Sequence, residues 1–101
     1  GATPLHWAAG GGHLSVVKLL LDRGASQKEI NKWGGTVLEQ AGWGFEHGLS
    51  DIEYPPVFDV LLAAGAKIRG SWLAWIEKVK GRSAEEKARV AEVFRRYGAT
   101  G

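Results

Sequence analysis

The chain has no cysteine, and this absence excludes disulfide bonds, thiolate metal ligands and cysteine nucleophiles at once. It also has no methionine, begins with glycine and shows no signal-peptide pattern at its N-terminus. No apolar run approaches the roughly 18 residues that a membrane-spanning helix needs. We therefore expect a segment of a longer protein, with no membrane segment and a cytoplasmic location.

The residues that are present indicate a small globular chain with an uneven charge. Its 101 residues leave room for one domain or a short array of repeats, and the 15 glycines and five tryptophans are unusually many. The formal net charge is only +2. Residues 67–101 hold nine basic and four acidic side chains, whereas residues 1–66 hold four basic and seven acidic ones. The two parts should therefore present opposite electrostatic potentials to a partner.

One pattern, an apolar helix end followed by Gly-Ala, occurs three times, at residues 19–25, 60–66 and, more loosely, 93–99. Glycine directly after a helix suits a left-handed C-terminal cap, because it has no Cβ to clash there. The glycines of successive copies are 41 and 33 residues apart. This spacing indicates a repeat of 33 residues with eight residues inserted once.

The first copy carries the most specific motif. Residues 3–8 read Thr-Pro-Leu-His-Trp-Ala, and Gly-His and Val-Val pairs follow at the spacing of a second helix. This unit resembles the ankyrin repeat, whose opening motif is T-P-L-H-x-A. The resemblance implies an all-α solenoid of stacked antiparallel helix pairs with short β-hairpin fingers. It also implies a non-catalytic module for protein–protein interaction.

The resemblance extends over the chain as a single domain, 1–101. We expect repeat one at residues 1–30, repeat two at 31–66 with an insertion at 44–54, and a divergent C-terminal capping repeat at 67–101. The third unit has so few residues before its first helix that its β-hairpin finger should be shortened or absent.

Helix signals fit these units. The insertion ends in two prolines, and a helix is predicted over 57–64. The last unit should contain a helix over 71–80 and a second one that ends at Tyr97. Ser83 and Glu86 have the spacing of a capping box at the start of that second helix.

The first copy has no polar helix before it. Leu5, Trp7 and the valines of the second helix should therefore present apolar surface, which an upstream repeat or a second copy of the chain would cover. Trp7 and Trp75 align at the same place in their units, where packing between neighbouring repeats is favoured. Trp72 is expected to help cover the last pair.

The sequence contains no convincing catalytic, metal or cofactor site. His6 and His13 match histidines of the repeat motif, and the resemblance implies structural hydrogen bonds for both. His47 lies beside acids in the insertion, but a metal site needs three or four converging ligands. No serine has the G-x-S-x-G context, and the glycines at 10–12 are not followed by a P-loop lysine. We expect no enzyme, no cofactor and no small-molecule substrate.

The partner-binding surface is expected on the concave side, formed by the hairpin tips and the first helices. The resemblance places Trp33 at a hairpin tip and Trp43 at the outward end of a first helix, where the family has partner-contacting residues. Tryptophan is the residue type most enriched at binding hot spots, although burial of one or both under the insertion is an open alternative. The predicted partner-binding residues are Lys32, Trp33, Gly35, Glu39, Trp43, Phe45 and Glu46.

Two other functions remain open at this point. The array could space or stabilise a larger protein without binding a ligand on its concave side. Alternatively, the basic residues between 67 and 96 could bind nucleic acid, but a solvated charged face is favoured because no groove-reading motif is present. The expected partner is another protein, with self-association through the first repeat as a further option, and neither nucleic acid nor a membrane is expected.

Overall fold

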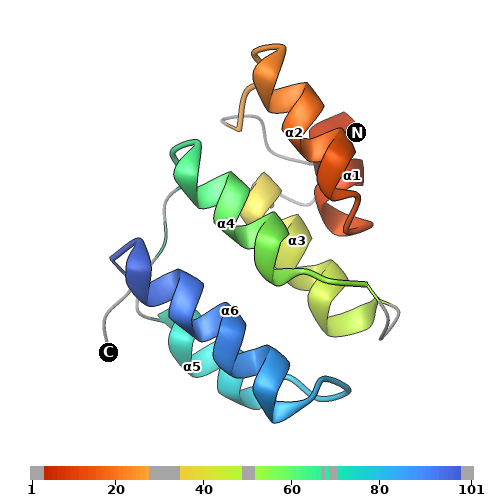
Figure 1. The fold of residues 1–101 in the computed structure, drawn as a ribbon. Coiled ribbons are helices and arrows are strands. Elements are labelled where there is room, and N and C mark those ends of the chain that lie inside the picture. The colour runs from red at the N-terminus through yellow and green to blue at the C-terminus, as the bar shows by residue number, and fades with distance from the viewer. Residues whose placement is uncertain (1–3, 28–34, 49–51, 67, 69–70, 99–101) are drawn as a thin grey trace.

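The computed structural model describes residues 4–27, 35–48, 52–66, 68 and 71–98. These residues form six helices and no strand: α1 (Pro4–Gly10), α2 (Leu14–Asp22), α3 (Val37–His47), α4 (Pro55–Ala63), α5 (Ser71–Lys78) and α6 (Ala84–Arg96). The helices form three pairs that stack in chain order (Figure 1). The predicted all-α solenoid is confirmed. The predicted hairpin fingers lie outside the described residues.

The helix ends follow the sequence signals closely. Gly24, Gly65 and Gly98, the shared glycines of the three copies, have φ values of +86°, +106° and +99°. Only glycine adopts this left-handed conformation without a steric penalty, which is why each copy ends its second helix there. The first helix of the last pair is shorter than the predicted 71–80, and α4 begins at Pro55, with prolines in its first turn.

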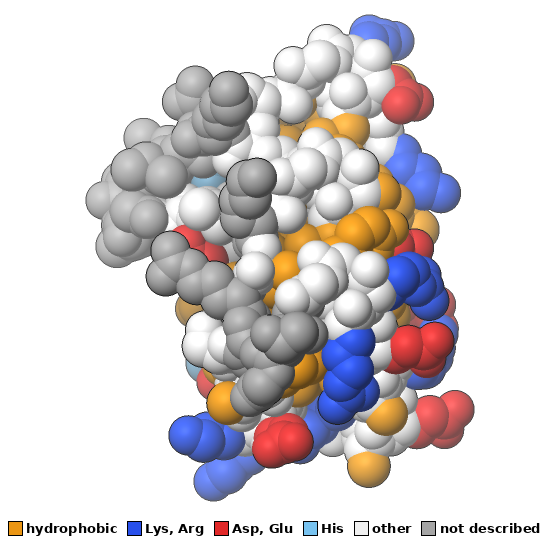
Figure 2. Space-filling model, turned by 90° about the vertical axis from the view of Figure 1, so that its left-hand side faces the viewer, with side chains coloured by type: hydrophobic (Ala, Val, Ile, Leu, Met, Phe, Trp, Pro, Cys, Tyr) orange, Lys and Arg blue, Asp and Glu red, His pale blue; other side chains and the backbone are white. Residues whose placement is uncertain are grey.

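One helix of each pair lies on each side of the stack. The first helices α1, α3 and α5 occupy one side, and the second helices α2, α4 and α6 occupy the other (Figure 1). Close packing joins α1 to α2 and α3, α4 to α2, α3 and α6, and α5 to α6. Hydrophobic side chains fill the seams between the pairs, and charged side chains gather along one edge (Figure 2). The largest fully buried side chains are Tyr54, Phe45, Phe58, Phe94, Leu5 and Leu61.

The loop conformation expected at the start of the predicted insertion, 44–54, is wrong, because its first four residues continue α3 as a helix to His47. His47 therefore lies in the last helical turn instead of on a loop. Gly44 allows this extension to pack on the first pair: a Cβ at Gly44 would overlap the carbonyl oxygen of Gly10 and lie 2.8 Å from its carbonyl carbon. The Tyr54 hydroxyl donates a hydrogen bond to the same Gly10 oxygen, at 2.7 Å.

A buried arginine ties the connection between α3 and α4 to the last pair. The side chain of Arg82 is 2% exposed and forms a salt bridge with Glu86, at 3.2 Å. Its guanidinium donates hydrogen bonds to the carbonyl oxygens of Phe45, at 2.7 Å, and Ile52, at 3.3 Å. It also lies over the rings of Phe45 and Tyr54, at 4.8 and 5.1 Å from their centroids. One cation therefore holds three separate segments together.

That salt bridge also changes the predicted capping box of α6. The Ser83 hydroxyl accepts a hydrogen bond from the Glu86 backbone N–H, as expected, at 3.1 Å. The carboxylate of Glu86, however, pairs with Arg82 and does not complete the box. A full capping box occurs instead at the start of α3, where Thr36 and Glu39 bond reciprocally. The T-x-x-E spacing of these two residues is the sequence pattern that predicts a capping box.

The uncovered face of the first pair differs in detail from the prediction. Trp7, Val16 and Leu19 are 74%, 45% and 50% exposed, whereas Leu5 and Val17 are buried. The apolar surface predicted for Trp7 on this face is therefore present, and Trp7 does not pack in the core of the described residues. The exposure predicted for Leu5 is wrong, because its side chain belongs to the buried core. Within the described ranges, no helix is long and apolar enough to cross a membrane.

Candidate partner-binding surface

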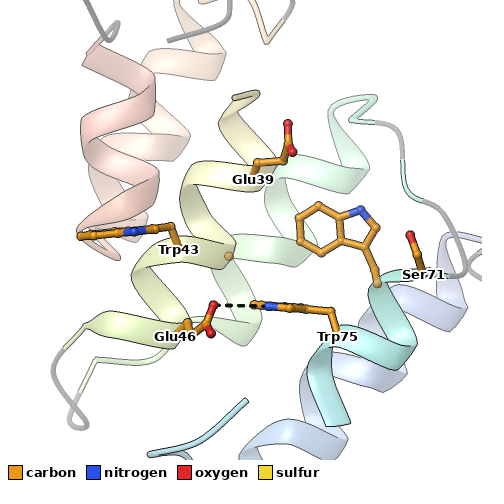
Figure 3. Close-up of a pocket in the computed structure, with 7 residues that line it drawn as sticks. Glu39, Trp43, Glu46, Ser71 and Trp75 are labelled. Carbon is orange, nitrogen blue, oxygen red and sulfur yellow. Dashed lines mark hydrogen bonds between the residues drawn. The ribbon is translucent and has the colours of Figure 1, made fainter. Parts of the chain in front are cut away.

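The first helices α3 and α5 border a groove on the outer side of the stack (Figure 3). Glu39, Trp43 and Glu46 of α3 are spaced by four and three residues, which places them along one face of a helix. Ser71, Trp72 and Trp75 of α5 form the opposite wall. We call this site the α3–α5 groove; its lining residues are Glu39, Gly42, Trp43, Glu46, Ser71, Trp72 and Trp75, and its volume is about 420 Å³.

The α5 wall is an aromatic cluster that the core supports. The rings of Trp72 and Trp75 meet edge to face with centroids 5.4 Å apart, and Trp72 contacts Phe94 of α6 in the same way at 5.6 Å. Gly42 forms the floor: a Cβ there would lie 3.1 Å from Cζ3 of Trp72 and 3.4 Å from Cη2 of Trp75. The small residue lets both indoles approach α3 closely.

Hydrogen bonds hold both carboxylates of the groove in place. Glu39 uses Oε1 to accept the Thr36 backbone N–H at 2.9 Å, as part of the capping box. Glu46 uses Oε2 to accept the indole N–H of Trp75 across the groove, at 3.4 Å (Figure 3). The same oxygen lies 3.9 Å from Nε2 of His47. One oxygen of each carboxylate is thus engaged within the fold, Glu39 by a short hydrogen bond and Glu46 by a longer one.

Trp43 forms the outer rim. Its side chain is 59% exposed, and its ring lies 5.0 Å from that of His47 at an angle of 44°. In Figure 3 the indole extends away from Trp75, toward α1. The alternative in which the insertion buries Trp43 is therefore wrong.

The predicted site residues divide into three groups. Glu39, Trp43 and Glu46 come together at the groove, while Lys32 and Trp33 lie outside the described residues. Gly35 has a structural contact, since its carbonyl oxygen accepts a hydrogen bond from Nε2 of His6, at 3.1 Å.

Phe45 is a correction to the predicted site. Its side chain is fully buried among Tyr54, Phe58 and Trp75, so it belongs to the core and cannot contact a partner. Successive residues of a helix project in different directions, so the exposed position of Glu46 does not make the preceding residue, Phe45, exposed.

Trp72 and Trp75 are the groove residues that sequence reasoning assigned to packing alone. Both are partly buried, but both also line the groove. The spacing of three residues, which places Trp72 and Trp75 on one face of a short helix, is a sequence signal for a shared surface. Their role in the groove becomes apparent only from the structure, which shows that α5 lies opposite the two acids of α3.

The two histidines of the repeat motif differ. His6 is fully buried and bonds to Gly35, so its predicted structural role is confirmed. His13 is exposed and makes no side-chain cap on α2, contrary to the hydrogen bond predicted for it. In the part of the chain that the structure describes, no three His, Asp or Glu side chains converge as metal ligands.

Comparison with known proteins agrees with the stacked helix pairs. Residues 1–32 match the family model of the ankyrin repeat. The chain contains an ankyrin repeat. A segment of 44 residues is 48% identical to the E3 ubiquitin-protein ligase XBAT32 of Arabidopsis thaliana; it covers 44% of this chain but only 9% of that protein. No solved structure matches the chain significantly. Ankyrin repeats are generally modules for protein–protein interaction, and α1 with α2 forms the matched repeat in this chain.

Proposed function

We propose that this chain is a non-catalytic protein-interaction module that binds its partner on the concave side, along the first helices α1, α3 and α5. The observation that carries the proposal is the α3–α5 groove, which two carboxylates and two indoles line and which has an exposed tryptophan at its rim. A large exposed aromatic residue beside a hollow is typical of binding hot spots. In this assignment the three helix pairs are repeat one (1–30), repeat two (31–66) and the capping repeat (67–101).

The rigidity of the groove supports this role. Glu39 is held by the cap of α3, Glu46 by Trp75, and Trp72 by Phe94 of the core. Side chains that are already ordered lose less conformational entropy when a partner binds. A preorganised surface of this kind favours recognition over a purely spacing role, which would not need exposed tryptophan.

A peptide selection tests the proposal without requiring the identity of the partner. Random peptides displayed on phage are selected against the immobilised chain, and the affinities of the selected peptides are measured for wild type and for Trp43→Ala. We expect Trp43→Ala to weaken binding by more than about 30-fold, as for a hot spot of about 2 kcal/mol. Leu19→Ala is the control, because it removes an exposed apolar side chain from α2 on the other side of the stack. Equal affinities of wild type and Trp43→Ala would refute the assignment.

The structure offers less support for nucleic-acid binding through the basic C-terminal part. Arg82 is buried, Arg96 lies 3.7 Å from Asp59, and the ammonium group of Lys87 donates to the carbonyl oxygens of Glu77 and Val79, each at 3.0 Å. These three cations are engaged within the fold. A labelled DNA duplex titrated by anisotropy at two salt concentrations tests this role, which requires affinity to fall steeply with salt.

A further inference from the structure

We propose that the α3–α5 groove receives a basic side chain, arginine or lysine, from an extended segment of the partner protein. This inference rests on the proposed function and adds the chemistry that the groove recognises. Two carboxylates, Glu39 and Glu46, lie along one helix, and none of the described residues that line the groove is basic. The volume of about 420 Å³ falls within the range of roughly 300–1,000 Å³ that ligand pockets have.

The walls suit a cation rather than a neutral apolar group. Indole rings carry negative charge on their faces and attract ammonium or guanidinium groups within about 6 Å. Trp72 and Trp75 both line the hollow, and their ring planes stand at 78° to each other, so the two indoles offer differently oriented surfaces to a ligand. An aliphatic stem can pack on these faces while the charged end reaches a carboxylate.

The carboxylates leave acceptor capacity for a charged ligand. The hydrogen bonds to Thr36 and Trp75 engage one oxygen of Glu39 and one of Glu46. An ionised carboxylate offers about four lone-pair sites, so both groups can accept further N–H bonds from a ligand. In Figure 3, Glu39 and Ser71 lie toward one end of the groove, and the Glu46–Trp75 pair lies toward the other. A basic side chain can therefore enter between the two charges.

The charge of the groove can be removed without breaking these structural bonds. Glutamine at the third position of a capping box still accepts the N-cap N–H, so Glu39→Gln preserves the start of α3. Glu46→Gln likewise keeps an amide oxygen for the Trp75 N–H. The double variant E39Q/E46Q thus changes two charges and little else. The matched control is E53Q/E77Q, which removes two exposed carboxylates that do not line the groove.

The test uses two capped pentapeptides, acetyl-Ser-Gly-Arg-Gly-Ser-amide and the same peptide with citrulline in place of arginine. Citrulline has nearly the same shape but no charge. Binding is followed by NMR through the indole N–H signals of Trp43, Trp72 and Trp75. We expect the arginine peptide to shift the Trp72 and Trp75 signals saturably, with at least tenfold higher affinity than the citrulline peptide. A third peptide, with lysine in place of arginine, should also bind more tightly than the citrulline peptide.

The variants give the second readout. E39Q/E46Q should weaken the arginine peptide at least fivefold, and E53Q/E77Q should leave its affinity within twofold of wild type. Equal binding of the arginine and citrulline peptides, or equal loss in both double variants, would overturn the inference. The proposed function would survive that result if the selected peptides still lost affinity in Trp43→Ala. If the arginine and citrulline peptides bound equally and the selected peptides also kept their affinity for Trp43→Ala, both the inference and the proposed function would be rejected. The two failures are therefore distinguishable.

Discussion

Helices α1 and α3 approach each other closely at Gly44. We therefore predict that a single methyl group added at this position disrupts the packing between the first two helix pairs. Glycine inside an exposed helix is less stable than alanine by about 0.5–1 kcal/mol, so Gly44→Ala would stabilise an isolated α3. In the folded chain, the added Cβ would overlap the carbonyl oxygen of Gly10 and lie 2.8 Å from the hydroxyl of Tyr54. The obstacle is backbone, which cannot rotate away as a flexible side chain can.

The size of the effect follows from two terms. Forcing an extra methyl group into a packed interface costs about 1–3 kcal/mol. Displacing Tyr54 from its 2.7 Å hydrogen bond to Gly10 adds about 1 kcal/mol. After the gain in helix propensity of about 0.5–1 kcal/mol, the net destabilisation should be about 1–3.5 kcal/mol, which is a sizeable share of the roughly 5–15 kcal/mol that stabilises a small domain.

Urea denaturation followed by circular dichroism measures this difference in the free energy of unfolding. Gly42→Ala is the matched control, since it has the same change in propensity in the same helix. Its Cβ would lie 3.1 Å from the Trp72 indole, a side chain that can move by a few tenths of an ångström. We expect Gly42→Ala to remain within about 1 kcal/mol of wild type. If Gly44→Ala were as stable as wild type or more stable, the packing of α3 on α1 at this point would be wrong.

Three further predictions concern other parts of the stack. Arg82→Lys keeps the charge but loses the planar fork that bonds Phe45 and Ile52, so the free energy of unfolding in urea should fall by about 2 kcal/mol; an unchanged value would contradict the anchoring role. Burial raises the pKa of Tyr54, and the hydrogen bond to Asp59 raises the pKa of Tyr97. The contribution of these two tyrosines to the free energy of unfolding should therefore be fully present below pH ~10, which is the pKa of tyrosine in the unfolded chain. It should be lost as the pH rises through their pKa values in the folded chain. Alkaline denaturation should be less steep in Tyr54→Phe, and an identical pH profile would exclude that contribution. If the apolar face of the first pair drives self-association, light scattering over a concentration series should show a mass above 10.9 kDa for wild type. The mass should decrease when Trp7 is replaced by serine, and a concentration-independent monomer would rule the association out.

The repeat architecture could be predicted from the sequence because its determinants are local. Glycine at each helix end, proline in the first turn of α4 and the motif at residues 3–8 act within a few residues along the chain. These signals located the helix pairs and their order from neighbouring residues alone. They also indicated His6 as structural, since its position in the motif carries that role.

The candidate site depended on contacts between distant residues, and the sequence alone could not determine them. The bond between Trp75 and Glu46 joins residues 29 apart, and the burial of Phe45 and Leu5 could not be predicted because burial depends on which helix lies opposite. Phe45 and Leu5 were both predicted to be exposed, and both side chains belong to the buried core. The sequence by itself determined which segments become helices and that the second helix of each pair ends at a glycine. Only the tertiary structure decided which helix faces meet, because packing joins residues that no local pattern relates.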